Sequence, residues 1–363
     1  MYKSFSILRF RGLSRCSLEG MRRVTILTGK NNAGKTAVLE SLLVHCGDHN
    51  PNLLMVVNAV RGLNKVRVDT FSQTDAPWLS VFTDYDDSRP IKLSGEVLTR
   101  ADQYELKSMT ISPVKNHTEL TGLSAYARNL SATQDGMSAK VLKLELSEGK
   151  KGKSHKHFMY FDGNQTVVFP PPPMVQYMTR LISPHSRDTA EALAEQFARL
   201  QVAGKVGLLV NALKEIEPRL TSLELVFNGE PMIHGNIGLK DRRLIPLALM
   251  GDGVMRVAAI ILALGSATGG LVLVDDIDTG IHHSVMPQYW ASIMRAAEVF
   301  DAQVVATTHS DECVRAALSA ASEIHMRDSL SLIRMERQED RVNAYAYDSD
   351  EMDAAFVTGL EVR

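Results

Sequence analysis

The stretch Gly29-Lys30-Asn31-Asn32-Ala33-Gly34-Lys35-Thr36 decides how this chain folds and what it can bind. It fits the pattern G-x-x-x-x-G-K-[ST], in which glycines let consecutive backbone N–H groups turn inward around a phosphate. The apolar run from Val24 to Leu27 precedes it and predicts a strand. Ala37 to Leu43 follows and predicts a helix whose N-terminus faces the same anion. Strand, loop and helix in this order predict a site for a nucleoside triphosphate with a metal ion.

Each residue type in this loop has an expected role. Lys35 supplies a point charge for the phosphates and is a predicted catalytic residue, and Thr36 supplies a hydroxyl for the metal. The expected nucleotide contacts are Gly29, Lys30, Asn31, Asn32, Ala33, Gly34, Lys35, Thr36 and Ala37. The predicted cofactors are therefore ATP and Mg²⁺.

Composition narrows the class of protein. The chain has 363 residues, 45% of them hydrophobic, which suits one large globular domain or two ordinary ones. Cys16, Cys46 and Cys313 stand far apart without a C-x-x-C motif, so neither a disulfide framework nor a zinc site is indicated. No apolar run approaches the roughly 18 residues needed to cross a bilayer, and arginines interrupt the N-terminal segment, so we expect a cytoplasmic protein. The net charge of −2 restricts any nucleic-acid contact to local patches.

We expect three regions along the chain. Residues 1–98 form an N-terminal ATPase lobe with the phosphate loop, and residues 99–188 form an inserted β-rich lobe. A basic loop or hairpin tip at 150–157 and a stiff polyproline connector at 169–173 belong to the inserted lobe. Residues 189–363 hold a helical segment and the C-terminal ATPase lobe.

Hydrophobic periodicity predicts the elements within these regions. Alternating Phe5, Ile7 and Phe10 predict the first strand. Further strands are expected at 24–27, 79–82, 91–97, 141–146, 223–227, 232–237, 271–274 and 303–307, and helices at 37–43, 189–200, 206–216 and 254–262.

The second half of the predicted site follows two apolar strands. Asp275 and Asp276 come directly after 271–274, at the edge of an open α/β sheet where ligands bind. Asp275 is the expected metal ligand, because Mg²⁺ prefers oxygen, and Asp276 would orient or deprotonate the attacking water. His309 follows the strand at 303–307 and would sense the γ-phosphate. A solvated acidic turn and a structural histidine are the alternative interpretations.

A glycine turn, Met250-Gly251-Asp252-Gly253-Val254-Met255-Arg256, opens a helix ahead of the acidic strand. Its exposed N–H groups predict a second anion site at Gly251, Asp252 and Gly253. One nucleotide cannot easily use both sites within one subunit. We therefore expect a head-to-tail homodimer, or a higher homo-oligomer, in which this turn caps the γ-phosphate bound to the partner.

These motifs resemble those of the ABC-type ATPases of the RecF, SMC and OLD group, over most of the chain. The matching stretches are FRG at 10–12, GKNNAGKT, GDGVMR, LVLVDDIDTGIHHS, TTHS at 307–310 and the closing GLEVR at 359–363. The chain most resembles stand-alone, OLD-like AAA family ATPases of bacterial anti-phage defence. That resemblance implies an α/β ABC-type head with a mixed sheet and an inserted antiparallel lobe. It also implies that Arg11 reaches the nucleotide, that Asp275 binds the metal and that Asp276 is the general base.

Three departures from that group matter. The general base is usually Glu, and Asp276 is one methylene shorter, so hydrolysis is expected to be slow. The turn at 250–256 lacks the serine of L-S-G-G-Q, and the glutamine loop is not placed, with Gln73 a weak candidate. A nuclease domain does not fit into the segment after His309, so we expect the effector, a nuclease, to be a separate chain.

Two other functions stay open at this point. One is an ATP-gated scaffold with very slow turnover, and the other is a RecF-like DNA repair ATPase. DNA is a possible partner, because the N-terminal arginines and the loop at 150–157 form basic patches. His282 and His283 would contact a neighbouring subunit or cap a helix.

Overall fold

A six-stranded sheet forms the centre of the computed structural model. The model describes residues 1–47, 50–63, 77–98, 103–114, 141–148, 154–161, 166–172, 179–184, 189–239, 243–339 and 341–358. The sheet has the order β16-β15-β3-β14-β13-β9. Its strands are β3 (Val24–Thr28), β9 (Thr179–Ile182), β13 (Leu271–Val274), β14 (Gln303–Thr307), β15 (Leu330–Gln338) and β16 (Arg341–Tyr347). All pairs are parallel except β15 with β16, so the sheet is mixed, as predicted.

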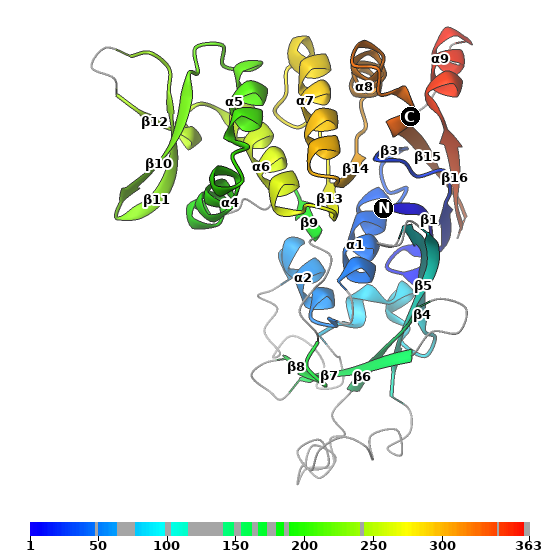
Figure 1. Ribbon diagram of the computed structural model, residues 1–363. Coiled ribbons are helices and arrows are strands. Elements are labelled where there is room, and N and C mark those ends of the chain that lie inside the picture. Colours follow the sequence, from blue (N-terminus) through cyan, green and yellow to red (C-terminus); the bar gives the residue numbers. More distant parts are fainter. Residues whose placement is uncertain are drawn as a thin grey trace.

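Alternate residues of the central strands pack into two separate cores. Val272 and Val274 lie in a core with the helices α6 (Asp252–Ser266), α7 (Met286–Val299) and α8 (Asp311–Glu323). Leu271 and Leu273 lie in the other core, with α1 (Lys35–Cys46). Figure 1 shows α6, α7 and α8 side by side on one side of the sheet and α1 on the other. The continuous apolar runs in β13 and β14 are explained by this burial on both faces.

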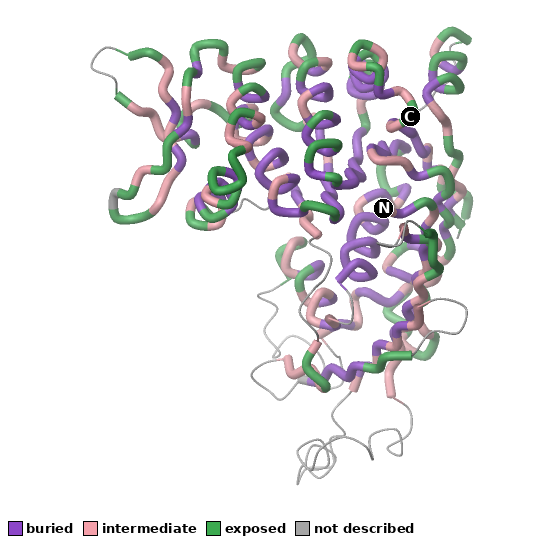
Figure 2. Tube along the Cα trace, viewed as in Figure 1, coloured by how far each residue is buried: buried purple, intermediate pink, exposed green. Residues whose placement is uncertain are grey.

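A second, antiparallel sheet covers α1. It has seven strands in the order β2-β1-β4-β5-β6-β7-β8. The strands are β1 (Tyr2–Phe10), β2 (Leu13–Leu18), β4 (Ile91–Leu98), β5 (Tyr104–Pro113), β6 (Val141–Glu148), β7 (Ser154–Phe161) and β8 (Thr166–Phe169). β4 pairs with β5 along the whole length of β4, so the sheet continues across the boundary expected between residues 98 and 99. α1 is therefore enclosed between the two sheets, and nearly all of it is buried (Figure 2).

Most predicted elements are confirmed, and one is wrong. Residues 79–82 were expected to form a strand, but Leu79–Val81 is a 3-10 helix, η3, followed by a second one, η4 (Thr83–Tyr85). The backbone N–H of Val81 donates to the carbonyl of Trp78 at 3.1 Å, and Trp78 is fully buried. A short apolar run fits a buried turn as well as a strand, and periodicity cannot separate them.

The C-terminal half holds the predicted helices and a small sheet. α4 (Ala190–Val202) begins at Thr189, whose hydroxyl accepts a bond from the N–H of Ala192 at 3.2 Å. The small sheet consists of β10 (Ser222–Asn228), β11 (Glu230–Asn236) and β12 (Ile245–Pro246). The other elements of this half are α5 (Val206–Lys214), η7 (Leu247–Leu249), η8 (His283–Val285), η9 (Arg327–Ser329) and α9 (Ser349–Thr358). In the N-terminal half, α2 (Leu53–Val60) follows α1. β9, expected in the inserted lobe, is the edge strand of the central sheet. Among the described residues, no helix is both long and apolar enough to cross a membrane.

Candidate nucleotide site

The phosphate loop connects β3 to α1, and its shape depends on two glycines. Gly29 has φ +135°, and a Cβ there would lie 2.2 Å from the carbonyl oxygen of Met335 on β15. Gly34 has φ +96°, and a Cβ there would lie 2.5 Å from Leu13 Cδ2 on β2. Both positions therefore exclude a side chain through backbone conformation and close packing. The two sheets together fix the loop between them.

Lys35 lies at the centre of this loop. Its Nζ donates to the carbonyls of Gly29, at 2.7 Å, and Lys30, at 3.2 Å. Its Nζ is also 3.3 Å from Nδ1 of His309. Burial lowers the pKa of the Lys35 ammonium, and the carboxylates of Asp276 and Asp275 oppose that shift. The predicted phosphate-binding lysine thus meets the predicted histidine, which lies 274 residues further along the chain.

Asp275 and Thr36 form the expected metal-binding pair. Asp275 is only 8% exposed, and its two carboxylate oxygens lie 3.2 and 3.0 Å from the hydroxyl of Thr36. Thr307 donates a further bond to the same carboxylate at 2.7 Å. A buried carboxylate beside a threonine hydroxyl fits Mg²⁺, which takes few protein oxygens and completes its shell with phosphate oxygens and water. Thr36 and Asp275 are thus the residues that would hold it.

Asp276, the predicted general base, has an unusual backbone conformation. Its φ is +45°, in the left-handed region that asparagine and aspartate tolerate better than most residues. Its N–H donates to the Thr307 hydroxyl at 2.8 Å, and its carboxylate lies 4.0 Å from Nε2 of His309. Burial, and then the charge of Asp275, raise the pKa of Asp276, while His309 lowers it. A carboxylate with a raised pKa is a stronger proton acceptor, as a general base requires.

Arg256 belongs to the site, although no role was predicted for it. It extends from α6, and its Nη2 donates to the backbone carbonyls of Asp275, at 2.5 Å, and Asp276, at 3.0 Å. Burial lowers the pKa of this guanidinium. An arginine in the first turns of a helix is electrostatically unfavourable, and this signal could have indicated a specific partner. Arg256 therefore links the glycine turn to the acidic strand.

The glycine turn forms the N-terminus of α6, as predicted. Gly251 is the N-cap, with φ +106° and open space around it, and Asp252 begins the helix. A Cβ on Gly253 would lie 3.0 Å from the carbonyl of Gly280, in the loop after the acids. A cavity of about 190 Å³ adjoins this turn, lined by Leu181, Ile182, Ser183, Pro184, Leu193, Asp252, Met255, Arg256, Ala259, Thr279 and Gly280. Ser183, which follows β9, was not anticipated from the sequence.

Arg11 is held by a carboxylate on α1 in this structure. Its Nε lies 2.5 Å from the carboxylate of Glu40, which is fully buried on α1. Its Nη2 donates to the carbonyl of Val57 and to Oδ1 of Asn58, at 3.2 and 3.1 Å. Arg61 pairs with the other carboxylate oxygen of Glu40. These bonds fix α2 against α1, and among the described residues the polar partners of Arg11 are not the other predicted site residues.

Several weaker predictions remain outside the site. His282 and His283 are exposed with their rings 4.1 Å apart, and His282 Nδ1 contacts the Ser284 hydroxyl at 2.8 Å. Gln73, the segment 149–153 and the closing residues 359–363 lie outside the described residues. DNA binding through the basic segment at 150–157 stays a prediction.

Two sequence comparisons found proteins similar to this chain. A family model described as "AAA domain, putative AbiEii toxin, Type IV TA system" matches residues 153–315, which include the glycine turn, both acids and His309. The ATP/GTP phosphatase of Helicobacter pylori (strain ATCC 700392 / 26695) is 21% identical over 334 residues, and the match covers 86% of each chain.

SMC heads are among the solved structures that this chain resembles. The SMC head bound to the C-winged helix domain of ScpA is 10% identical, with a TM-score of 0.48 and coverage of 97% of this chain and 99% of that one. The SMC head domain from Thermotoga maritima is 9% identical, with a TM-score of 0.40 and coverage of 96% and 99%. These TM-scores are low, so the fold assignment rests on the strand order described above. The phosphate loop, the acids and the histidine strand together have the arrangement of a P-loop ATPase.

Proposed function

We propose that this chain hydrolyses ATP in a site that a second copy completes, so that ATP closes a homodimer and hydrolysis opens it. One observation carries this proposal: the two helix N-termini suited to bind phosphate lie on opposite faces of one sheet. α1 packs on the face of Leu273, and α6 packs on the face of Val274. One nucleotide in one subunit would have to reach around the edge of the sheet to contact both N-termini. A head-to-tail pair of subunits resolves this geometry.

Within that site, the described residues have distinct roles. The loop N–H groups and Lys35 would bind the β- and γ-phosphates, and Thr36 and Asp275 would hold Mg²⁺, which neutralises phosphate charge. Asp276 would accept the proton of the attacking water, because its pKa is raised. His309, between Lys35 and Asp276, would donate to the γ-phosphate or to that water. Arg256 and Thr307 would hold the backbone of the two acids in place.

We further propose that this ATPase regulates a separate effector, a nuclease, in anti-phage defence. The matching family model is described as "AAA domain, putative AbiEii toxin, Type IV TA system", and this description supports a role together with another component. Purification from the native host with a non-hydrolysable ATP analogue, and again without nucleotide, tests this step. We expect metal-dependent nuclease activity to co-purify in one nucleotide state and not in the other. Equal recovery without any nuclease activity would count against the effector assignment.

The alternative with specific support is an ATP-gated scaffold of very slow turnover. Asp276 is shorter than the usual glutamate, and its carboxylate lies 4.0 Å from His309, beyond hydrogen-bonding distance. Steady-state measurement of phosphate release distinguishes the hydrolytic cycle from the scaffold. Turnover of several per second favours the hydrolytic cycle, whereas an ATP-dependent dimer that persists for hours favours the scaffold.

The dimer itself is tested by light scattering after size exclusion, using Asp276→Asn to slow hydrolysis. We expect this variant to be monomeric without nucleotide and dimeric with ATP and Mg²⁺. Lys35→Ala should stay monomeric in both conditions. A dimer that forms equally with and without ATP would contradict the proposal.

A further inference from the structure

The arginine that lies beside the phosphate loop comes from the other end of the chain. β15 runs parallel to β3, with Arg334 opposite Thr28, the last residue before the loop. The next residue of β15, Met335, contacts Gly29 through its carbonyl oxygen. Arg337 lies two residues further on, level with the outer turn of the loop. No local sequence signal predicts this position, because strand pairing alone creates it.

Arg337 bonds to two backbone carbonyls with different parts of its guanidinium. Nε donates to the carbonyl of Asn32 at 2.9 Å, and Nη2 donates to the carbonyl of Gly12 at 2.8 Å. Asn32 is the outer residue of the phosphate loop and has φ +65°. Gly12 belongs to the turn between β1 and β2. The planar fork of Arg337 thus ties a strained residue of the loop to the neighbouring hairpin.

The charge of Arg337 stays available to an anion. Within the part of the chain that the structure describes, Arg337 is exposed and forms no ion pair. Its neighbours differ in this respect, because Arg334 pairs with Glu336 and Arg11 pairs with Glu40. A guanidinium held by neutral carbonyls keeps its full charge, and that charge lies next to a loop built for a triphosphate.

We propose that Arg337 is a positioning residue for nucleotide binding, which holds the phosphate loop open through Asn32 and adds positive charge beside the triphosphate. This inference rests on the proposed binding of ATP. It assigns to Arg337 part of the role that the sequence suggested for Arg11. The effect should appear in affinity and KM rather than in kcat, because the acids and His309 are unchanged.

The experiment compares Arg337→Ala, Arg337→Lys and Arg341→Ala by titration with a fluorescent ATP analogue. Arg341 is an exposed arginine at the start of β16, next to β15, and its loss gives the same change in net charge. We expect the Kd to rise about 10-fold for Arg337→Ala and about 3-fold for Arg337→Lys, which keeps the charge but loses the fork. Arg341→Ala should stay within about 2-fold of the wild type.

Three outcomes would overturn the inference. They are a wild-type Kd in Arg337→Ala, an equal loss in Arg341→Ala, and a fall in kcat with unchanged KM. If Arg337→Ala lowers the melting temperature without nucleotide, the test relies on Arg337→Lys. An ATP affinity of Arg337→Lys no better than that of Arg337→Ala would then refute the role of charge. Failure of the proposed function would give a different result from failure of this inference. In that case the wild type and Lys35→Ala would bind ATP equally poorly.

Discussion

Replacing Arg256 with Met should slow hydrolysis without weakening ATP binding. Methionine keeps most of the apolar volume of the arginine stem, but it removes the two bonds to the carbonyls of Asp275 and Asp276. A hydrogen bond from a charged donor contributes about 1.5 to 3 kcal/mol, and a left-handed residue such as Asp276 costs on the order of 1 to 3 kcal/mol to maintain. We expect about 2 kcal/mol of the transition-state stabilisation to be lost as the acidic turn relaxes. That corresponds to a roughly 30-fold lower kcat.

The assay is steady-state phosphate release together with ATP titration. Arg295→Met is the matched control, since Arg295 is exposed on the neighbouring helix α7 and forms no hydrogen bond or ion pair among the described residues. We expect the Kd for ATP to stay within about 3-fold in both variants, because neither residue contacts the phosphate loop. A kcat in Arg256→Met equal to that of the control would refute the role assigned to Arg256. A large loss of ATP affinity with normal kcat would refute it as well.

Three further outcomes follow from the packing around the site. Glu40→Gln should destabilise the fold by about 3 kcal/mol or more in urea unfolding, because it leaves Arg11 buried without its counter-charge. The control, Glu195→Gln in the exposed pair with Arg199, should cost below about 0.5 kcal/mol. Gly34→Ala should abolish ATP binding, whereas Gly62→Ala, with φ +79° and open space, should not; equal effects would mean that the clash with Leu13 is unimportant. Burial lowers the pKa of His45 to about 4, so the neutral form stabilises the fold above pH 6.5 and that stability is lost as pH falls from 6.5 towards 4. Unfolding at pH 7.5 and pH 5 should show a larger loss for the wild type than for His45→Gln, and equal losses would contradict the assignment.

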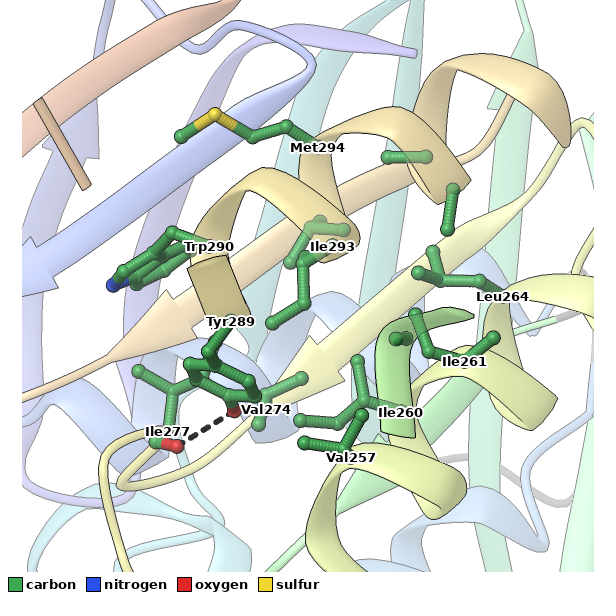
Figure 3. Packing of buried hydrophobic residues seen from close by; sticks show 14 of the residues in the cluster. Val257, Ile260, Ile261, Leu264, Val274, Ile277, Tyr289, Trp290, Ile293 and Met294 are labelled. Atoms are coloured by element: carbon green, nitrogen blue, oxygen red, sulfur yellow. Dashed lines mark hydrogen bonds between the residues drawn. The ribbon is translucent and has the colours of Figure 1, made fainter. Parts of the chain in front are cut away.

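The core behind the acids shows why much of the fold was predictable from sequence. β13 is a four-residue apolar strand buried on both faces, so its pattern is unambiguous once a phosphate loop is recognised. Figure 3 shows α6 and α7 packed there, with Val257 and Ile260 near Val274. Tyr289 donates from α7 to the carbonyl of Ile277 at 2.8 Å and fixes the chain just after Asp276. The local pattern of apolar residues predicts these helices and strands, and burial of their apolar side chains packs them against one another.

The remaining features depend on contacts between distant segments. The antiparallel sheet joins β1 and β4, whose paired residues are 84 (Leu8 and Lys92) to 95 (Tyr2 and Val97) positions apart, so periodicity alone suggested a separate lobe. The positions of Arg11 and Arg337 also depend on contacts that the local sequence does not reveal. The sequence predicts that Arg11 reaches the nucleotide, yet its guanidinium pairs with the buried Glu40 on α1. Arg337 reaches the loop through the pairing of β15 with β3, which nothing near residue 337 indicates.

The most direct test of the composite site mixes two inactive variants. Lys35→Ala damages the phosphate loop and leaves the glycine turn intact, while Gly251→Glu places a side chain and a negative charge where only glycine suits the backbone. Each variant alone should show almost no ATP hydrolysis. An equal mixture should recover about a quarter of wild-type activity, since half of the dimers are mixed and each mixed dimer has one intact site of two. No recovery in the mixture, or normal activity in Gly251→Glu alone, would contradict a site shared between subunits.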